Sequence, residues 1–281
     1  MNYFKDKTVA ISGGTGYLGK NLTRKLLSLG AKVRAFSRDG GKVEVMQSEL
    51  QGFNDALRVF TANARDKDRM LEATDGCDIL IVAHAEKRIN ICEENKGECF
   101  ENNYIGARNL FRAARLNKIK KIIFISTDKA EKSYTVYGDS KKMAEDLAFD
   151  YNNMSPQSRF AVVRYGNIWD STDSVIRKWD KLYPEKELLI TNPDMTRFYM
   201  CIDKAVELIL NSIKNMKGGE MFYKKGMKAL RISDIIKHRY PNAKTRIIGL
   251  RCREKMHEEI VDGYSSEKNV VPYDELIKEL E

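Results

Sequence analysis

The chain has 281 residues, of which 42% are hydrophobic and 32% charged, and its formal net charge is +9. This composition excludes a disordered chain, and the length predicts one large domain or two unequal ones. Two kinds of ligand would explain this positive charge: nucleic acid or an anionic small molecule. Because the lysines are scattered and form no block with aromatic residues, we expect the small molecule and no nucleic acid.

The N-terminal residues enter a strand almost at once, and no apolar run approaches the roughly 18 residues of a membrane span. We therefore expect no signal peptide, no membrane association and a cytoplasmic location. Five cysteines are present, an odd number without a Cys-x-x-Cys pair or zinc spacing: Cys77, Cys92, Cys99, Cys201 and Cys252. Reduced thiols and no metal site are the simplest interpretation.

The glycine-rich stretch GGTGYLG, at residues 13–19, follows a strand expected at residues 8–12. Leucines then recur at helical spacing as far as Gly30, which predicts a helix that ends there. A strand, a glycine-rich turn and a helix in this order predict a dinucleotide site, because glycines let the backbone approach a pyrophosphate at the positive helix end. The residues expected to contact the cofactor here are Gly13, Thr15, Gly16, Tyr17, Leu18 and Gly19.

A second strand, expected at residues 32–36, ends in Ser37, Arg38 and Asp39, with Lys42 nearby. An acid at this point binds the ribose 2′-hydroxyl of NAD, whereas a cation suits the 2′-phosphate of NADP. Because Ser37 and Arg38 come first, we expect NADP, with Lys42 assisting. The alternative, in which Asp39 binds the ribose and Arg38 is an ordinary surface cation, stays open.

The strand expected at residues 78–82 runs into Ala83, His84 and Ala85. The small side chains of Ala83 and Ala85 would let the nicotinamide half of a cofactor lie against the backbone. For His84 we expect a packing role, because the sequence suggests no partner for it. A long helix is expected at residues 98–117.

The apolar run at residues 121–125 predicts a buried strand, followed directly by Thr127, Asp128 and Lys129. In an open parallel sheet, ligands bind at the carboxyl ends of the strands. Tyr137 and Lys141 are one helical turn apart, and a neighbouring lysine lowers the cost of forming a phenolate. We therefore expect the active site here; the alternative is a polar loop between a strand and a helix.

Strands and helices alternate with short connections, which predicts an α/β fold with a Rossmann-type, doubly wound parallel sheet. Further strands are expected at residues 57–60 and 160–163, and a helix at residues 68–73. We expect an NADP-binding domain with the catalytic residues at residues 1–168. A smaller substrate-binding subdomain, which can exchange segments with the first, is expected at residues 169–263, and a charged, mobile tail at residues 264–281.

Within the second half, the pattern predicts helices at residues 174–181 and 203–213 and a loop at residues 195–198. Short strands are expected at residues 221–223 and 246–249. This half should cover the carboxyl edge of the first sheet.

Together these motifs resemble the extended short-chain dehydrogenases/reductases, and among them the soluble UDP-N-acetylglucosamine 4,6-dehydratases that invert C5. The motifs that carry the resemblance span nearly the whole chain: GGTGYLG at 13–19, FSRD at 36–39, STDKA at 126–130, YGDSK at 137–141, VVRYGN at 162–167, MTRF at 195–198, GGEMF at 218–222 and IIGL-R-x-x-EKMHEE at 247–259. The resemblance implies UDP-N-acetylglucosamine as substrate and NADP as cofactor. It also implies a homo-oligomer, as is common on this fold.

The resemblance assigns Thr127, Tyr137 and Lys141 to the catalytic triad, in which Tyr137 takes the C4 hydroxyl proton while hydride passes to NADP⁺. Lys129 would remove the C5 proton as base, and Asp128 would protonate the departing C6 hydroxyl. Hydride then returns to C6, and reprotonation of C5 from the other face would invert it. A lysine base must be neutral part of the time, which requires desolvation or nearby positive charge.

The resemblance also implies ligand contacts outside the catalytic segment. Asn63 stands where an adenine-contacting Asp is common, and Ala64 follows it. The expected substrate-binding residues are Lys87, Asn167, Thr196, Arg197, Arg251 and Glu254. The arginines suit a diphosphate because a guanidinium binds two oxygens at once; the alternative for each is a surface ion pair.

The chain departs from the family pattern at two places: Cys252-Arg253 replaces the usual Pro-Gly, and Asp170 and Asp173 replace glycines after Asn167. Several readings stay open. The enzyme could retain C5 or release a 5,6-ene. A UDP-sugar 4-epimerase would have no use for Asp128 and Lys129. A non-catalytic NADP sensor would have lost the chemistry residues, which are all present.

Overall fold

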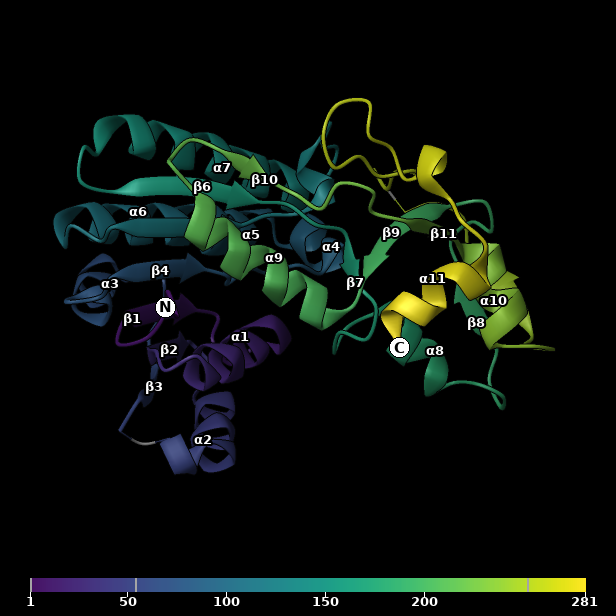
Figure 1. The fold of residues 1–281 in the computed structure, drawn as a ribbon. Helices are drawn as coiled ribbons and strands as arrows, with labels where there is room; N and C mark the ends of the chain where they lie inside the picture. The colour runs from purple at the N-terminus through teal and green to yellow at the C-terminus, as the bar shows by residue number, and fades with distance from the viewer. Residues whose placement is uncertain (1, 54, 252) are drawn as a thin grey trace.

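A seven-stranded parallel sheet is the centre of the computed structural model, which describes residues 2–53, 55–251 and 253–281 (Figure 1). The strand order is β10-β6-β5-β4-β1-β2-β3, and every pairing is parallel. The central strands are apolar on both faces, as a sheet covered on both sides requires. Their bounds are β1 (Thr8–Ser12), β2 (Lys32–Ser37), β3 (Leu57–Thr61), β4 (Ile79–Val82), β5 (Lys121–Ile125), β6 (Arg159–Val163) and β10 (Met221–Phe222).

Helices cover both faces of this sheet and form a separate core on each. One core joins the sheet to α1 (Tyr17–Ser28), α2 (Gly40–Glu49) and α9 (Ile202–Asn215). The other core joins it to α3 (Lys67–Thr74), α6 (Gly106–Leu116) and α7 (Val136–Met154). Alternate residues of one strand serve the two cores: Val9 and Ile11 face the first, and Ala10 faces the second. The predicted Rossmann-type fold is therefore confirmed.

The helix expected at residues 98–117 is broken into three pieces. After α4 (Ile89–Glu94) the chain forms α5 (Lys96–Phe100), a π-helical turn η2 (Glu101–Ile105) and then α6. The wider turn brings Asn102 and Asn103 into the interior, where both are buried. Helical periodicity in a sequence does not distinguish a π turn from an α turn, and such turns are frequent at functional sites.

The second unit is smaller and lies beyond the carboxyl edge of the large sheet (Figure 1). Its three-stranded sheet has the order β11-β9-β7, and a two-stranded ribbon pairs β12 with β8. An apolar core joins β8, β9 and β11 to three helices. The bounds are β7 (Asn167–Ile168), α8 (Val175–Asp180), β8 (Leu188–Ile190), β9 (Thr196–Met200), β11 (Ala229–Arg231), α10 (Ile232–Arg239), β12 (Thr245–Ile247) and α11 (Tyr273–Leu280).

Two sequence expectations for this unit are wrong. The loop expected at residues 195–198 is mostly strand β9, which is buried along its whole length at the centre of the small sheet. The charged segment at residues 264–281 is not a mobile tail, because α11 buries Tyr273 and Leu276 in the second core. Both expectations were based on the polar and charged residues in these segments, which the tertiary structure partly buries.

The two units exchange segments. Helix α9 packs on the same face of the large sheet as α1, and β10 adds to its edge beside β6 (Figure 1). Residues 202–222 therefore return to the first unit after the chain has entered the second. The domain boundary at residue 168 stays a prediction.

A buried arginine ties these parts together. Arg164, which is 1% exposed, follows β6 and forms a bidentate pair with Glu145 of α7. Its Nη1 donates to Glu131 Oε2 at 2.6 Å and to the carbonyl oxygen of Ile260 at 2.7 Å. One guanidinium thus fixes four segments that are distant in sequence.

Candidate active site

The predicted catalytic segment leaves the carboxyl end of β5 in the middle of the large sheet. A short 3₁₀ turn, η3 (Asp128–Ala130), follows, and the backbone N–H of Asp128 donates to the carbonyl oxygen of Tyr165 at 3.1 Å. Asp128 is fully buried and Thr127 is 8% exposed. The turn therefore holds both side chains at the sheet edge, where an open parallel sheet binds its ligands.

Asp128 and Lys129 form a close ion pair. Asp128 Oδ1 accepts from Lys129 Nζ at 3.0 Å and from Thr127 Oγ1 at 3.0 Å, whereas Asp128 Oδ2 is buried and has no hydrogen-bond partner among the described residues. Lys129 Nζ also lies 3.3 Å from Asn167 Oδ1. A buried carboxylate oxygen without a partner is costly unless a ligand satisfies it. Asp128 therefore has one oxygen for Lys129 and one for a bound molecule.

The charges around Lys129 decide its protonation. Burial alone lowers its pKa, but the negative charges of Asp128 and Glu258 outweigh burial and the positive charge of Arg197, so the pKa is raised. Glu258 Oε1 lies 3.7 Å from Lys129 Nζ. Burial and a nearby cation, the two features that a lysine base requires, are both present, but in this arrangement the two carboxylates outweigh them.

Tyr137 and Lys141 lie on one face at the start of α7. Thr135 caps this helix by accepting from the Gly138 N–H at 3.1 Å, which places Tyr137 in its first turn. Burial raises the pKa of Tyr137, and a hydrogen bond with Thr127 acts in the opposite direction. Burial lowers the pKa of Lys141 to about 7, and its Nζ lies 3.9 Å from the centre of the Phe124 ring.

A polar layer supports Tyr137 from the helices α4 and α5. The thiols of Cys92 and Cys99 are 2.6 Å apart and pack with Tyr137. Asn103, from the π turn, donates to Ser140 Oγ at 3.0 Å and to the carbonyl oxygen of Glu86 at 3.0 Å. The start of α7 is thereby fixed against the neighbouring helices.

The glycine-rich turn has the geometry of a dinucleotide cradle. Gly13 has φ +68°, and a Cβ there would lie 2.8 Å from the backbone of His84. Helix α1 begins at Tyr17 with no acidic residue in its first turn, so its positive end is free for an anion. The residues present therefore fit a pyrophosphate. His84 has the packing role expected of it, but it also has partners: Nδ1 lies 2.8 Å from Ser12 Oγ, and Nε2 lies 3.1 Å from the carbonyl oxygen of Asn102.

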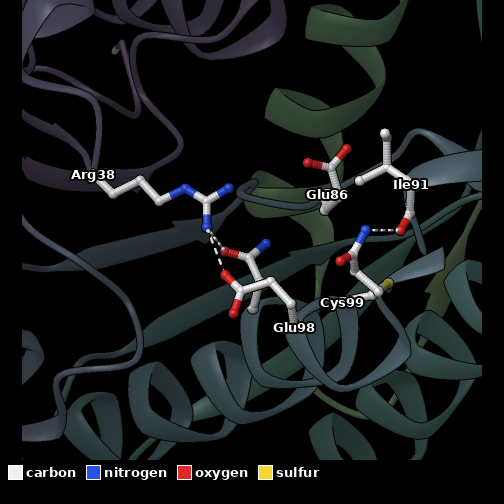
Figure 2. A pocket seen from close by; sticks show the side chains of 7 residues that line it. Arg38, Glu86, Ile91, Glu98 and Cys99 are labelled. Atoms are coloured by element: carbon white, nitrogen blue, oxygen red, sulfur yellow. Dashed lines mark hydrogen bonds and ion pairs between the residues drawn. The ribbon is translucent and has the colours of Figure 1, made fainter.

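Arg38 reaches from the end of β2 toward α5 and η2 (Figure 2). Its Nη1 lies 3.4 Å from Asn102 Oδ1 and 3.6 Å from Glu98 Oε1. A cavity of about 190 Å³ lies between Arg38 and the helices α4 and α5. It is lined by Arg38, Glu86, Ile91, Asn95, Glu98, Cys99 and Asn102.

Asp39 caps helix α2 instead of facing this cavity. Its Oδ1 accepts from the Lys42 N–H at 3.1 Å, and its Oδ2 lies 3.3 Å from Lys42 Nζ. Lys42 is therefore paired, and Arg38 is the cation at the end of β2 that faces the cavity. Ser37 Oγ accepts from the Asp39 N–H at 3.3 Å.

The remaining cofactor candidates lie along the same sheet edge. Asn63 Oδ1 accepts from the Arg65 N–H at 3.1 Å, and the carbonyl oxygen of Ala64 accepts from Asn109. Ala83, at the end of β4, donates its N–H to Ser12 Oγ. Ala85 lies in the loop that follows β4.

The predicted substrate residues divide into two groups. Asn167 belongs to the catalytic cluster through Lys129, and Arg197 lies 3.5 Å from Glu254 Oε1 beside it. Most donors of Arg197 are occupied, however, because they bind the carbonyl oxygens of residues 196, 255 and 256. The Thr196 hydroxyl is buried between His257 and Ser266, and its assignment to the substrate stays a prediction.

Lys87 and Arg251 lie farther out. Lys87 Nζ pairs with Asp173 Oδ2 at 3.4 Å, which joins the loop after β4 to the segment before α8. Asp170, the other departure from the family pattern, pairs with Arg177 at 2.6 Å. Arg251 is exposed after β12, and Cys252 lies outside the described residues.

Several residues that sequence reasoning did not select belong to the cluster. Glu258 is 2% exposed, and Lys255 Nζ lies 2.8 Å from its Oε2. The hydroxyl of Tyr199 on β9 is buried near Asn167 and Arg197. Glu258 and Lys255 are part of the EKMHEE motif, which could have drawn attention to them; Tyr199 sits in a segment read as a loop.

The fold and the site define an extended short-chain dehydrogenase/reductase of the nucleotide-sugar type. More narrowly, the chain belongs to the family described as "Polysaccharide biosynthesis protein", which matches residues 9–277. It is 37% identical to a UDP-N-acetylglucosamine 4,6-dehydratase (inverting) of Campylobacter jejuni, over 94% of this chain and 80% of that protein. It is also 33% identical to a UDP-glucose 4-epimerase of Rickettsia bellii, over 92% of this chain and 79% of that protein.

Among solved structures, Pen from Bacillus thuringiensis superposes with a TM-score of 0.88 at 32% identity, covering 92% of this chain and 84% of that one. DesIV, a dTDP-glucose 4,6-dehydratase from Streptomyces venezuelae with NAD and TYD bound, has a TM-score of 0.76 at 16% identity and covers 97% and 90%. The second comparison shows the shared fold alone. No helix in the described part of the chain is long and apolar enough to span a bilayer.

Proposed function

We propose that the protein is a UDP-N-acetylglucosamine 4,6-dehydratase that uses NADP and inverts C5. The observation that carries the proposal is the pair of Asp128 and Lys129, whose charged groups are 3.0 Å apart, while Asp128 Oδ2 is buried without a hydrogen-bond partner in the part of the chain that the structure describes. Elimination of water from a 4-keto sugar needs a base at C5 and an acid at the C6 hydroxyl. The similarity to the Campylobacter jejuni enzyme supports the choice of substrate.

One proton transfer within the pair produces the acid and the base together. Lys129 passes a proton to the Asp128 carboxylate, which leaves a neutral amine and a neutral acid. Lys129 then takes the C5 proton, the C5–C6 double bond forms, and Asp128 protonates the C6 oxygen as its bond to carbon breaks. Water leaves, and the pair returns to its charged state without a proton from solvent. A raised pKa of Lys129 is therefore compatible with its role as base.

Tyr137 takes the proton of the C4 hydroxyl. When bound, NADP⁺ supplies the redox chemistry, accepting hydride from C4 and returning it to C6. Lys141, whose pKa burial lowers to about 7, becomes charged below that pH and then stabilises a Tyr137 phenolate. Thr127 hydrogen-bonds the same phenolic group.

Other residues bind the two ligands. Arg38 is the cation that we assign to the 2′-phosphate of NADP, because Asp39 is committed to capping a helix. Arg251 and Glu254 are assigned to the UDP group of the substrate, and Lys87 is assigned to its sugar. For Arg197 we propose an indirect role, because its guanidinium holds the backbone of residues 255 and 256 in place.

The test is proton NMR of UDP-N-acetylglucosamine incubated with the purified protein in D₂O. We expect a 6-deoxy methyl signal, deuterium at C5, and couplings that report the inverted configuration. Couplings that report the same C5 configuration as in the substrate would indicate the C5-retaining reaction. Vinyl signals without a methyl group would indicate release of the 5,6-ene. An unchanged spectrum with bound NADP would favour a sensor.

A UDP-sugar 4-epimerase is the second candidate, because epimerases are among the similar proteins. It requires Tyr137 and Lys141 but leaves Asp128 and Lys129 without a task. In the same spectrum, an epimerase would produce a C4 epimer with its C6 hydroxyl intact, no methyl signal and no deuterium at C5.

A further inference from the structure

Glu258 is a buried carboxylate that the proposed reaction has not yet used. It lies in the irregular segment between β12 and α11, and it is 2% exposed. Its backbone is fixed by two hydrogen bonds with Ser266: the Glu258 N–H donates to Ser266 Oγ at 2.9 Å, and the Ser266 N–H donates to the Glu258 carbonyl oxygen at 2.8 Å. The carboxylate is therefore held in place from a separate part of the chain.

Three cations surround this carboxylate. Glu258 Oε1 lies 3.7 Å from Lys129 Nζ and 4.0 Å from Arg197 Nε, and Oε2 lies 2.8 Å from Lys255 Nζ. Lys255 also donates to the carbonyl oxygen of Glu131 at 2.8 Å, which holds its ammonium beside Glu258. Burying a charge is costly unless it is paired, and here each carboxylate oxygen has at least one cation within 4.0 Å.

We propose that Glu258 is a positioning residue that strengthens Lys129 as the base for the C5 proton. The inference rests on the proposed function only in naming Lys129 as that base. When Asp128 has accepted the proton of Lys129, Glu258 is the remaining anion within 4 Å of Nζ. It stabilises the ammonium that forms when Lys129 takes the C5 proton, and so favours proton removal from a weakly acidic carbon.

The charges that face Lys129 come from three elements. Asp128 is on its own turn, Glu258 is on the C-terminal segment, and Arg197 is on β9. Asn167 on β7 contributes a neutral oxygen at 3.3 Å, and Lys255 acts through Glu258. Asp128, which is nearer, is the larger negative influence, and Glu258 is the second; neutralising Glu258 therefore removes one of the two carboxylates that oppose Arg197 among the described residues.

The experiment measures Lys129 directly, without turnover. The cofactor-bound protein is labelled with a trace of acetic anhydride across pH 7 to 11, and the acetylated Lys129 peptide is quantified by mass spectrometry. In Glu258→Gln we expect the labelling curve to move to lower pH by about one unit or more, as loss of a nearby opposite charge requires. In Lys255→Gln, which removes a cation from Glu258, we expect a shift in the opposite direction.

Glu259→Gln is the matched control, because Glu259 is next in sequence and pairs with Lys132 at 3.0 Å, away from Lys129. Its labelling curve should coincide with that of the wild type. The curve of Glu258→Asp, which keeps the carboxylate, should lie closer to that of the wild type than to that of Glu258→Gln. If Glu258→Gln and Lys255→Gln both leave the curve unmoved, or move it in the same direction, the proposal is wrong. Should Glu258→Gln fail to fold, the sign of the Lys255→Gln shift decides alone.

Turnover separates this inference from the proposed function. If the labelling curves shift as expected but UDP-N-acetylglucosamine gives no methyl signal, Glu258 acts on Lys129 and the assigned reaction is wrong. If the methyl product forms and the curves do not shift, the dehydratase assignment stands and the role of Glu258 is refuted.

Discussion

Replacing Lys141 by methionine should stabilise the protein while it abolishes catalysis. Lys141 is 2% exposed, and burial lowers its pKa to about 7 from an ordinary value of 10.5. The unfolded chain therefore binds a proton more tightly than the folded chain between these two pH values. Folding must release that proton, which costs free energy that a methionine of similar length does not incur.

The cost depends on pH in a defined direction. At pH 7 the gap between the two pKa values corresponds to about 4 kcal/mol of destabilisation, and at pH 9 to about 2 kcal/mol. It disappears above the unfolded pKa and is constant below the folded one. The stability advantage of Lys141→Met over the wild type should therefore shrink by about 2 kcal/mol between pH 7 and pH 9.

Urea unfolding of the nucleotide-free proteins, followed by far-ultraviolet circular dichroism at both pH values, measures this difference. Comparing two pH values cancels the change in packing, including the lost contact with the Phe124 ring, because packing does not titrate. An advantage that is equal at pH 7 and pH 9 would mean that Lys141 has an ordinary pKa, and it would refute the account of how Tyr137 is activated.

Three further substitutions test other parts of the site. Lys129→Ala should abolish water loss, measured by the methyl signal, while NADP binding by fluorescence titration stays nearly unchanged; normal turnover would refute its assignment as base. Arg38→Ser should weaken NADP binding about 10- to 100-fold and NAD binding little, since it removes one charge-assisted contact with the 2′-phosphate; equal losses for both nucleotides would contradict that contact. Arg164→Met should lower the free energy of unfolding, measured by urea melts, by about 3–5 kcal/mol, because Glu145 is left buried without its partner. Adding Glu145→Gln should recover part of this loss. If the second substitution lowers the free energy of unfolding further, packing rather than the unpaired charge dominates.

The fold and the catalytic pairings were predictable because they depend on local patterns. Strand β5 is a continuous apolar run, and the Thr-Asp-Lys triplet directly follows it, so its place at the sheet edge follows from parallel topology alone. Tyr137 and Lys141 share a face because of helical periodicity. These inferences need no knowledge of distant contacts.

The charge set around Lys129 was not predictable in the same way. The sequence pattern predicts a loop at Arg197. In the structure Arg197 lies on β9, the central strand of a small sheet formed with β11 and β7. Glu258 lies in a segment without regular structure, so no periodicity shows that its side chain points inward. The pKa of Lys129 depends in part on these two residues, so the balance of charges around it could not be predicted from the sequence.

The anchoring of the C-terminal segment by Arg164 and Ser266 has a consequence for synthesis on the ribosome. Asp128 and Lys129 are translated near the middle of the chain, and the large sheet can assemble around them before residues 255–266 exist. Until those residues are made, Arg164 lacks the carbonyl of Ile260, and Lys129 lacks its second carboxylate. A nascent chain halted before this segment could bind a nucleotide at its glycine-rich turn but would have no complete acid–base centre, so the chemistry requires residues 255–266 to have been made.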